Sequence, residues 1–133
     1  MAKIRMDGFD DVIRDLTSLD VDRMTEEMIE AAEPVMVNNL KAWSARHYVD
    51  GDMYNSIKST GVKKNSSGKY LVVRPTGKDK DGVRNMEKMA YLEYGTAHQK
   101  ATPVLTPAVK ESEGTIESKF ESIFNKYLEK VSI

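Results

Sequence analysis

The chain has 133 residues, the length of one domain, of which 40% are hydrophobic and 31% are charged. No apolar run approaches the roughly 18 residues that a membrane span needs, and the N-terminal residues turn acidic too early for a signal peptide. The absence of cysteine excludes disulfides, a thiol nucleophile and thiolate-bound metal centres. We therefore expect a single domain over residues 1–133, made in the cytoplasm and without a membrane partner.

The net charge of −1 hides a strong regional imbalance. Residues 1–57 carry 12 acidic and 6 basic side chains, whereas residues 58–88 carry 3 acidic and 9 basic ones. A basic segment of this size is either a solvated surface or a contact surface for a partner. Patches of opposite sign on one chain also suit head-to-tail contacts between copies.

Helical spacing dominates the first third of the chain. Apolar residues between positions 7 and 19 recur at intervals of three and four, which predicts a short amphipathic helix. A capping-type stretch at 19–22 predicts a second, longer helix. Its apolar face consists of Met24, Met28, Ala32, Val35, Met36, Leu40, Trp43 and His47. Pro34 lies inside this pattern and predicts a kink or a break, and residues 50–52 predict the end of the helical region.

The period of the hydrophobic pattern changes at the middle of the chain. Residues 57–63 and 69–74 predict two strands, and the polar stretch 64–68 between them has turn composition. Together they predict an antiparallel β-hairpin. The following segment, 76–84, is rich in Gly, Lys and Asp and predicts a flexible surface loop.

Helical spacing returns in the last third. Residues 85–94 predict a short helix with Met86, Met89, Ala90 and Tyr94 facing inward, although a strand ending at Tyr94 is an alternative. The last predicted helix has Thr106 as its cap and Pro107 at its first position, and it continues to about residue 131. Its apolar stripe, expected to be core, consists of Ile116, Phe120, Ile123, Phe124, Tyr127, Leu128 and Val131.

These elements predict an α+β fold. A small antiparallel sheet, made of the hairpin and a possible extra strand, is expected to be packed by the N-terminal helices and the long C-terminal helix. We find no internal repeat and no low-complexity segment.

No pattern in the sequence indicates a catalytic or metal site. His47 lies on the apolar side of a predicted helix, and His98 follows a turn without a nucleophile nearby. Glu93 and His98 would supply only two metal ligands, which is too few to indicate a site. Phosphate-loop and dinucleotide fingerprints are also missing from the sequence. We therefore expect a protein that is not an enzyme and that has no cofactor and no metal.

Nucleic-acid binding is the main alternative that the residues themselves suggest. Lys63, Lys64, Lys69 and Arg74 form a candidate basic contact surface that could face phosphates. Only Tyr70 is placed to stack on a base, and no signature of a DNA or RNA module accompanies it. Non-specific proximity to DNA, or a small nucleic-acid-binding module built on the hairpin, therefore stays open.

The stretch 91–109 carries a more specific pattern. It contains Tyr-Leu-Glu-Tyr-Gly-Thr-Ala-His, followed after two residues by Ala-Thr-Pro-Val-Leu-Thr-Pro-Ala. This stretch resembles the signature of the phage tail-component family named for the gene-ten product of lambdoid long-tailed phages. The Gly-Asp-Met-Tyr-Asn-Ser-Ile stretch at 51–57 fits the same layout. The motif residues that we single out are Glu93, Tyr94, Gly95, Thr96, Pro103, Leu105 and Pro107. Val104 departs from the family, which commonly has Phe there.

The chemistry of the motif residues is consistent with a rigid turn. Gly95 permits a positive φ, and the Thr96 hydroxyl can hydrogen-bond back to close the turn. Pro103 and Pro107 stiffen the path into the last helix, and Leu105 can anchor that helix on the core. A purely structural turn and a direct partner contact both fit these residues.

The resemblance implies a non-enzymatic virion protein of a tailed bacteriophage or prophage. Such a protein, made in the bacterial host cytoplasm, joins or completes the tail at the head–tail neck. The resemblance further implies self-association into a ring around the DNA channel. Partners would be the head–tail connector or stopper, the tail terminator and the tail tube. A tail terminator of similar architecture is an alternative assignment.

Overall fold

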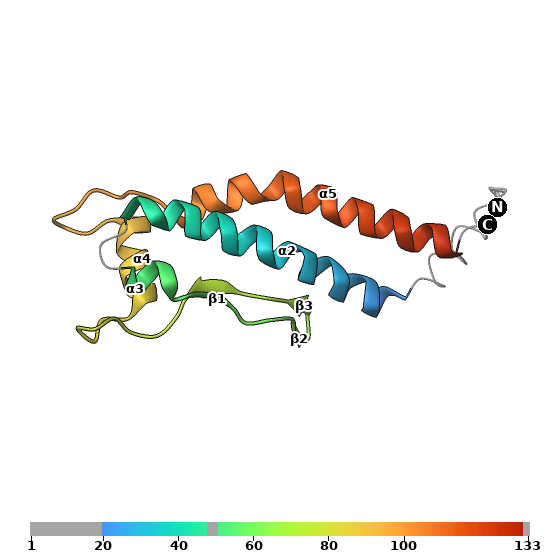
Figure 1. Ribbon diagram of the computed structural model, residues 1–133, viewed down its shortest axis with the longest axis horizontal. Helices are drawn as coiled ribbons and strands as arrows, with labels where there is room; N and C mark the ends of the chain where they lie inside the picture. Colours follow the sequence, from blue (N-terminus) through green and yellow to red (C-terminus); the bar gives the residue numbers. More distant parts are fainter. Residues whose placement is uncertain (1–19, 48–50, 132–133) are drawn as a thin grey trace, which may run out of the picture.

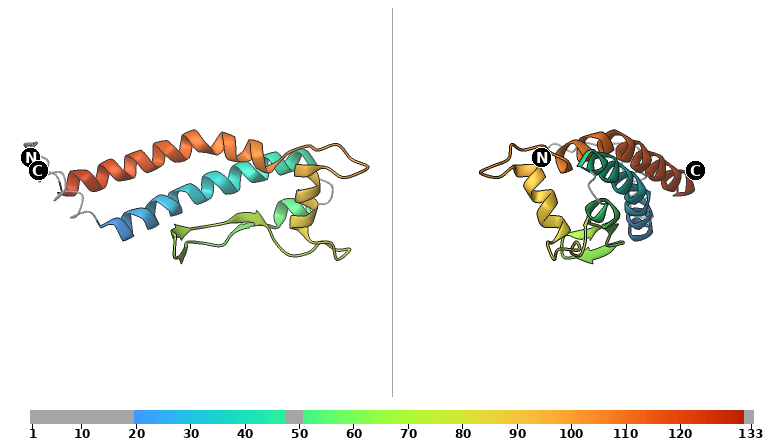
Figure 2. Two further views of the ribbon diagram at one scale, coloured as in Figure 1. Left: turned by 180° about the vertical axis from the view of Figure 1, so that it is seen from behind. Right: turned by 60° about the vertical axis from the view of Figure 1, so that its left-hand side comes forward.

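Two long helices lie side by side, and a β-hairpin lies along one of them (Figure 1). The computed structural model describes residues 20–47 and 51–131, so the helix expected over 7–19 lies outside the described residues. Helix α2 (Val21–Ser44) packs along most of helix α5 (Leu105–Val131) and also contacts the hairpin. The turned views in Figure 2 show the same order, with α2 between α5 and the hairpin. The fold is α+β, as predicted.

Helix α2 begins where the sequence predicts. The side chain of Asp20 occupies the N-cap position and accepts a hydrogen bond from the backbone N–H of Arg23 at 3.2 Å. Of the kink or break expected at Pro34, the break is wrong, because α2 continues through Pro34 to Ser44, and the kink stays a prediction. Pro34 is exposed, so water can reach the carbonyl that loses its helical donor there.

The helical region does not end at 50–52 as expected. A 3-10 turn, η1 (Ala45–His47), ends the first helical stretch, and a short helix, α3 (Asp52–Asn55), follows. Gly51, with φ of 85°, lies immediately before α3. A left-handed residue at this point redirects the chain from the helix pair toward the hairpin.

The predicted hairpin is present but interrupted. Strand β1 (Ile57–Ser59) pairs with β4 (Val73–Pro75), and β2 (Lys63–Asn65) pairs with β3 (Gly68–Tyr70), both antiparallel. We call residues 57–75 the arm.

The interruption of the arm is a bulge. The backbone N–H of Thr60 donates to the carbonyl of Val72 at 3.0 Å, and the next pair in the register is Lys63 with Tyr70. Two residues, Gly61 and Val62, therefore stand opposite one, which is the definition of a β-bulge. Gly61 has a φ of +73°, which favours glycine at this position.

The bulge keeps the exposed side chains of the arm on one face and the buried side chains on the other. On the face turned away from α2, which we call the outer face, every residue is exposed. These residues are Lys58, Thr60, Lys63, Tyr70, Val72 and Arg74. On the opposite face, Ile57 and Pro75 are buried and Lys69 lies against α2. The alternation continues across the interruption because the extra residue restores the register.

The loop 76–84 is closed by hydrogen bonds around Asp79. One carboxylate oxygen of Asp79 accepts from the backbone N–H groups of Asp81 and Val83, both at 2.9 Å. The other oxygen is 2.9 Å from the Lys88 ammonium. The flexibility expected for this loop stays a prediction, but its path is set by one side chain.

Apolar residues gather in two clusters at opposite ends of the helix pair. The larger cluster is formed by Leu40, Met53, Ile57, Met89, Val104 and Ala108, from five different elements and the residue before α5. The smaller cluster joins Met24 of α2 to Tyr127 of α5. The Tyr127 hydroxyl donates to the Glu27 carboxylate at 2.7 Å, which adds a polar contact at that end.

Two expectations about buried faces need correction. Tyr94, expected to face inward, is 80% exposed, while Glu93 is buried in its place. The strand alternative is wrong, because helix α4 spans Asn85–Tyr94. Among the stripe residues from Ile116 to Leu128, whose burial the structure describes, only Tyr127 is buried, and Phe120 and Phe124 are half-buried. A helix that packs on a single partner helix covers only a narrow strip of its own surface.

The packing analysis predicts the effect of truncating the larger cluster. Leu40 is 2% exposed, and Leu40→Ala should lower the free energy of unfolding by about 2–5 kcal/mol because it leaves a cavity. Val21→Ala, at an exposed site of the same helix, is the control and should change it by less than about 0.5 kcal/mol. Urea unfolding of both variants measures the difference, and equal midpoints would contradict this assignment of the core.

Candidate assembly site

The carboxylate of Glu93 holds the beginning of α5. Its Oε2 accepts hydrogen bonds from the backbone N–H groups of Val104 and Leu105 at 2.8 and 3.0 Å. Its Oε1 accepts from the backbone N–H of Thr106 at 2.9 Å and from the Thr106 hydroxyl at 2.6 Å. The first N–H groups of a helix have no acceptor within the helix itself. Glu93 of α4 therefore supplies the cap that the sequence assigned to Thr106.

This environment sets the ionisation of Glu93. Burial alone would raise the pKa of Glu93, but the hydrogen bonds from Thr106, Val104 and Leu105 outweigh it. The net result is a pKa below the usual value. A negative charge at a helix N-terminus is also favoured by the helix dipole. The residue is consequently a charged, buried cap at neutral pH.

The prediction for the start of α5 was wrong by two residues. The helix begins at Leu105, so Thr106 and Pro107 are its second and third residues. Val104 precedes the helix, is fully buried, and receives a hydrogen bond on its carbonyl from Ala108 at 3.2 Å. Leu105 packs against the larger apolar cluster, as expected, and Pro103 is exposed.

Gly95 closes the turn between α4 and α5. Its φ is 77°, and a Cβ at this position would lie 2.9 Å from the Gln99 carbonyl oxygen and 2.9 Å from the Ala101 nitrogen. The backbone N–H of Thr96 donates to the Gln99 carbonyl at 2.9 Å, and the Thr96 hydroxyl accepts from the His98 N–H at 3.2 Å. Glycine is required here because any side chain would meet backbone on both sides.

The joint defined by residues 93–106 brings most of the motif together. Glu93, Gly95, Thr96 and Leu105 have structural roles within it. Tyr94 and Pro103 are exposed and make no such contact, so they are available to a partner.

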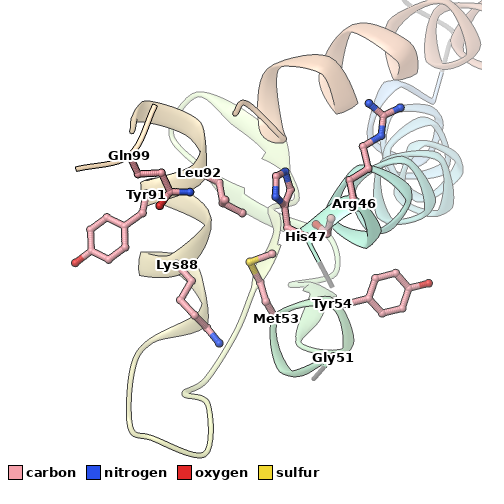
Figure 3. Close-up of a pocket in the computed structure, with 10 residues that line it drawn as sticks. Arg46, His47, Gly51, Met53, Tyr54, Lys88, Tyr91, Leu92 and Gln99 are labelled. Atoms are coloured by element: carbon pink, nitrogen blue, oxygen red, sulfur yellow. The ribbon is translucent and has the colours of Figure 1, made fainter. Parts of the chain in front are cut away.

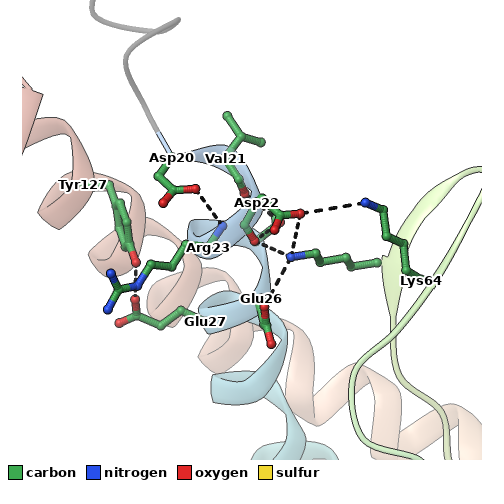
Figure 4. Close-up of polar contacts among 10 residues, drawn as sticks. Asp20, Val21, Asp22, Arg23, Glu26, Glu27, Lys64 and Tyr127 are labelled. Carbon is green, nitrogen blue, oxygen red and sulfur yellow. Dashed lines mark hydrogen bonds and ion pairs between the residues drawn. The ribbon is translucent and has the colours of Figure 1, made fainter.

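The candidate basic surface is divided between two faces of the arm. The ammonium of Lys69 is 3.0 Å from Asp22 and 3.4 Å from Glu26, and its side chain is only 11% exposed. Lys64 lies 4.0 Å from Asp22 at the edge of this group (Figure 4). The hydrogen bond and the charge of Lys69 lower the pKa of Asp22. Lys69 therefore holds the arm against α2, whereas Lys64 forms only an exposed, distant ion pair with Asp22.

The remaining two candidates lie on the outer face. Lys63 and Arg74 are exposed, and neither forms an ion pair within residues 20–47 and 51–131. The expectation of one continuous basic surface is thus corrected. Acidic side chains of α2 and basic side chains of the arm partly neutralise each other inside one molecule, and of the four candidate residues Lys63 and Arg74 stay exposed and unpaired within the described part of the chain.

A cleft of about 530 Å³ lies between η1, α3 and α4 (Figure 3). Its lining includes His47, Met53 and Leu92, together with Tyr54 and Tyr91, whose rings point in opposite directions. Lys88, also in the lining, is paired with Asp79. His98 lies outside this lining on the exposed turn, so the structure does not bring the two histidines together.

The described residues offer no grouping for metal chemistry. Within 20–47 and 51–131, no three His, Asp or Glu side chains come together as a group that could hold a metal ion. Both oxygens of Glu93 are engaged by α5, so the pairing with His98 considered above is not formed. In the same part of the chain, no helix is long and apolar enough to cross a membrane.

Comparisons with protein-family models, with curated proteins and with solved structures give no significant match. The resemblance to the phage family therefore depends on the motif residues alone.

Two polar contacts of the site, Glu93 with the start of α5 and Lys69 with Asp22, were not predicted from the sequence. Glu93 was singled out as a motif residue, but its role as a cap for a helix that begins 12 positions later was not foreseen. A signal was available, since a Glu at a helix end precedes a segment with unsatisfied donors. Nothing in the sequence shows that Lys69 reaches Asp22, 47 positions earlier.

Removing the cap should destabilise the protein. Glu93→Ala leaves buried N–H groups without acceptors, and we expect a loss of about 1–3 kcal/mol in the free energy of unfolding. Glu93→Gln retains one oxygen and should lose less. The control is Glu111→Ala, on an exposed position of α5, which should stay near wild type. Chemical unfolding measures the three free energies of unfolding. If that of Glu93→Ala equals the wild-type value, the cap is not required.

The ionisation of Glu93 also predicts a pH dependence. Because its pKa is lowered in the folded state, protonation favours the unfolded chain. The contribution of Glu93 is complete above its usual value of 4.5 and is lost as the pH falls through the lowered pKa. Melting temperatures measured from pH 7 down to 3 should fall less steeply for Glu93→Gln than for wild type. Parallel curves would contradict the assignment.

Proposed function

We propose that the protein is a structural component of a tailed bacteriophage or prophage particle. It joins or completes the tail at the head–tail neck, as a ring around the DNA channel. The protein acts by assembly, through complementary surfaces, and performs no reaction.

One observation carries the proposal: the residues of the resemblance act together in the structure. Glu93 caps α5, Gly95 permits the turn, and Leu105 anchors the helix on the core. These contacts fix the angle between the short helix α4 and the long helix α5. An assembly protein needs such a joint because partners must meet its surfaces in one orientation.

The surfaces offered to partners lie away from this joint. The outer face of the arm is exposed and basic, and Tyr94 is exposed beside the motif turn. Aromatic residues are enriched in protein–protein contact regions. Neighbouring ring subunits, the head–tail connector or stopper, the tail terminator and the tail tube are the partners that this role requires. A tail terminator is the alternative position along the neck.

A nucleic-acid-binding module is the second candidate function. The observation that favours it is the outer face, on which Lys58, Lys63 and Arg74 accompany the exposed ring of Tyr70. Cations can meet phosphates there, and an aromatic ring can stack on a base.

Charge reversal on the outer face separates the two functions. Lys63→Glu with Arg74→Glu should leave the melting temperature unchanged, because exposed charges contribute little to stability. In bacteria producing the phage, this variant should accumulate full heads and free tails. Lys69 is unsuitable for this test, since its reversal would place three negative groups together at Asp22 and Glu26.

A gel-shift titration completes the comparison. We expect weak binding of duplex and single-stranded DNA by the wild-type protein at low salt. Tight binding that falls steeply with salt, together with normal particles from the charge-reversed variant, would refute the neck assignment in favour of nucleic-acid binding.

A further inference from the structure

The arm has two faces, and among the described residues the rest of the chain packs on only one of them. The inner face is held to α2 by Lys69, which contacts Asp22 and Glu26. These two carboxylates stand four residues apart on the helix, so they lie on one side of it. The inner contact therefore shows one way in which the arm binds a helix: a cation of the arm contacts carboxylates spaced by one helical turn.

The outer face carries charges that repel each other. Lys58 stands directly opposite Arg74 in the register of β1 and β4, and like charges in that position are destabilising. Lys63 lies further along the same face, beyond Thr60 and Val72. None of the three cations is paired with an acidic side chain of residues 20–47 or 51–131. An acidic partner would remove this repulsion.

Helix α5 carries a complementary row. Glu113, Glu117 and Glu121 are each four residues apart, all exposed, and without an ion pair in the described part of the chain. Like charges at this spacing are also destabilising on a helix. One turn before the row stands Val109, an exposed apolar residue. The row thus repeats the spacing of Asp22 and Glu26 at a place where no cation of residues 20–47 or 51–131 is paired with it.

The dimensions of the two patches agree. From Arg74 to Tyr70, which stands opposite Lys63, the ribbon spans about 13 Å at about 3.3 Å per residue. From Glu113 to Glu121 the helix spans about 12 Å at about 1.5 Å per residue. Within one molecule the patches cannot meet, since α2 lies between α5 and the arm and the outer face points away from it (Figure 1).

We propose that the outer face of the arm binds the row Glu113, Glu117 and Glu121 on α5 of a second copy of the chain. The cations at Lys58, Arg74 and Lys63 meet the carboxylates, and Val72 lies at the centre of the contact. Two different patches of one chain form this interface, so it is heterologous and can close into a ring. The inference rests on the proposed function, which requires a ring, and it names the surfaces that build it.

Disulfide trapping tests this contact directly, because the natural chain contains no cysteine. Val72→Cys and Glu117→Cys place single thiols at the centres of the two patches. Mixed and oxidised, the two variants should give a cross-linked heterodimer at least several-fold above either homodimer. The chain carrying both substitutions should give a ladder of cross-linked oligomers on a non-reducing gel. One-molar sodium chloride should reduce both products, since the contact is electrostatic.

The control replaces Glu117→Cys by Ser118→Cys, the next residue of the same helix, which is exposed on a different side. If Val72→Cys pairs with Ser118→Cys as well as with Glu117→Cys, or with neither, the proposal is wrong.

Charge exchange provides an independent test. Lys63→Glu with Arg74→Glu, or Glu113→Lys with Glu121→Lys, should each abolish the ladder when added to the chain that carries Val72→Cys and Glu117→Cys. All four charge substitutions together should restore it, since two cations of the arm and two carboxylates of the row have then exchanged signs. Failure of the restored variant, with its fold intact, would overturn the pairing of these two patches.

The outcomes distinguish this inference from the proposed function. Loss of head–tail joining in the Lys63→Glu, Arg74→Glu variant, without any specific cross-link, would mean that the arm binds another neck protein. The function would then stand and the self-contact would fall. A specific ladder from the cysteine chain, together with normal particles from the Lys63→Glu, Arg74→Glu variant, would instead support the self-contact and refute the head–tail joining function.

Discussion

The structure depends on one buried carboxylate. Helix α5 begins beside the larger apolar cluster, where the N–H of Val104 is buried and those of Leu105 and Thr106 are half-buried, and these groups have no acceptor within the helix. Glu93 supplies both of its oxygens to that helix end and remains charged there. Since Glu93 belongs to α4, the same contact orders the turn at Gly95 and fixes how α4 meets the helix pair. The position of the long helix follows from this contact.

Much of the fold could be predicted from periodicity, because α2, α4 and the arm each have a regular apolar pattern. The start of α5 could not. Thr106 and Pro107 form a good local capping pattern, but an acceptor from another helix is stronger and no local rule includes it. Tyr94 was misplaced for a similar reason: spacing alone allowed either Tyr94 or Glu93 to face inward. A buried acid with four hydrogen bonds is the exception to the hydrophobic pattern.

The charged residues of the site could be predicted from the sequence, but the faces of the arm on which they lie could not. Counting charges shows an acidic first half and a basic middle segment, and it names Lys63, Lys64, Lys69 and Arg74 together. Only the strand register shows that these residues divide between two faces, and the bulge at Gly61 decides which face each one takes. In the sequence, the acidic and basic segments resemble binding surfaces for other molecules. In the structure, some of these opposite charges pair with each other and hold the arm to α2.

The length of α5 turns the joint into a lever. Its 27 residues extend about 40 Å, and the two apolar clusters pack against it near its two ends. A tilt of about 5° at the Glu93 end would displace the far end by roughly 3.5 Å over that length. That displacement is comparable to the length of a hydrogen bond. Small substitutions in the motif can therefore misalign contacts that lie at the opposite end of the molecule, without touching any residue there.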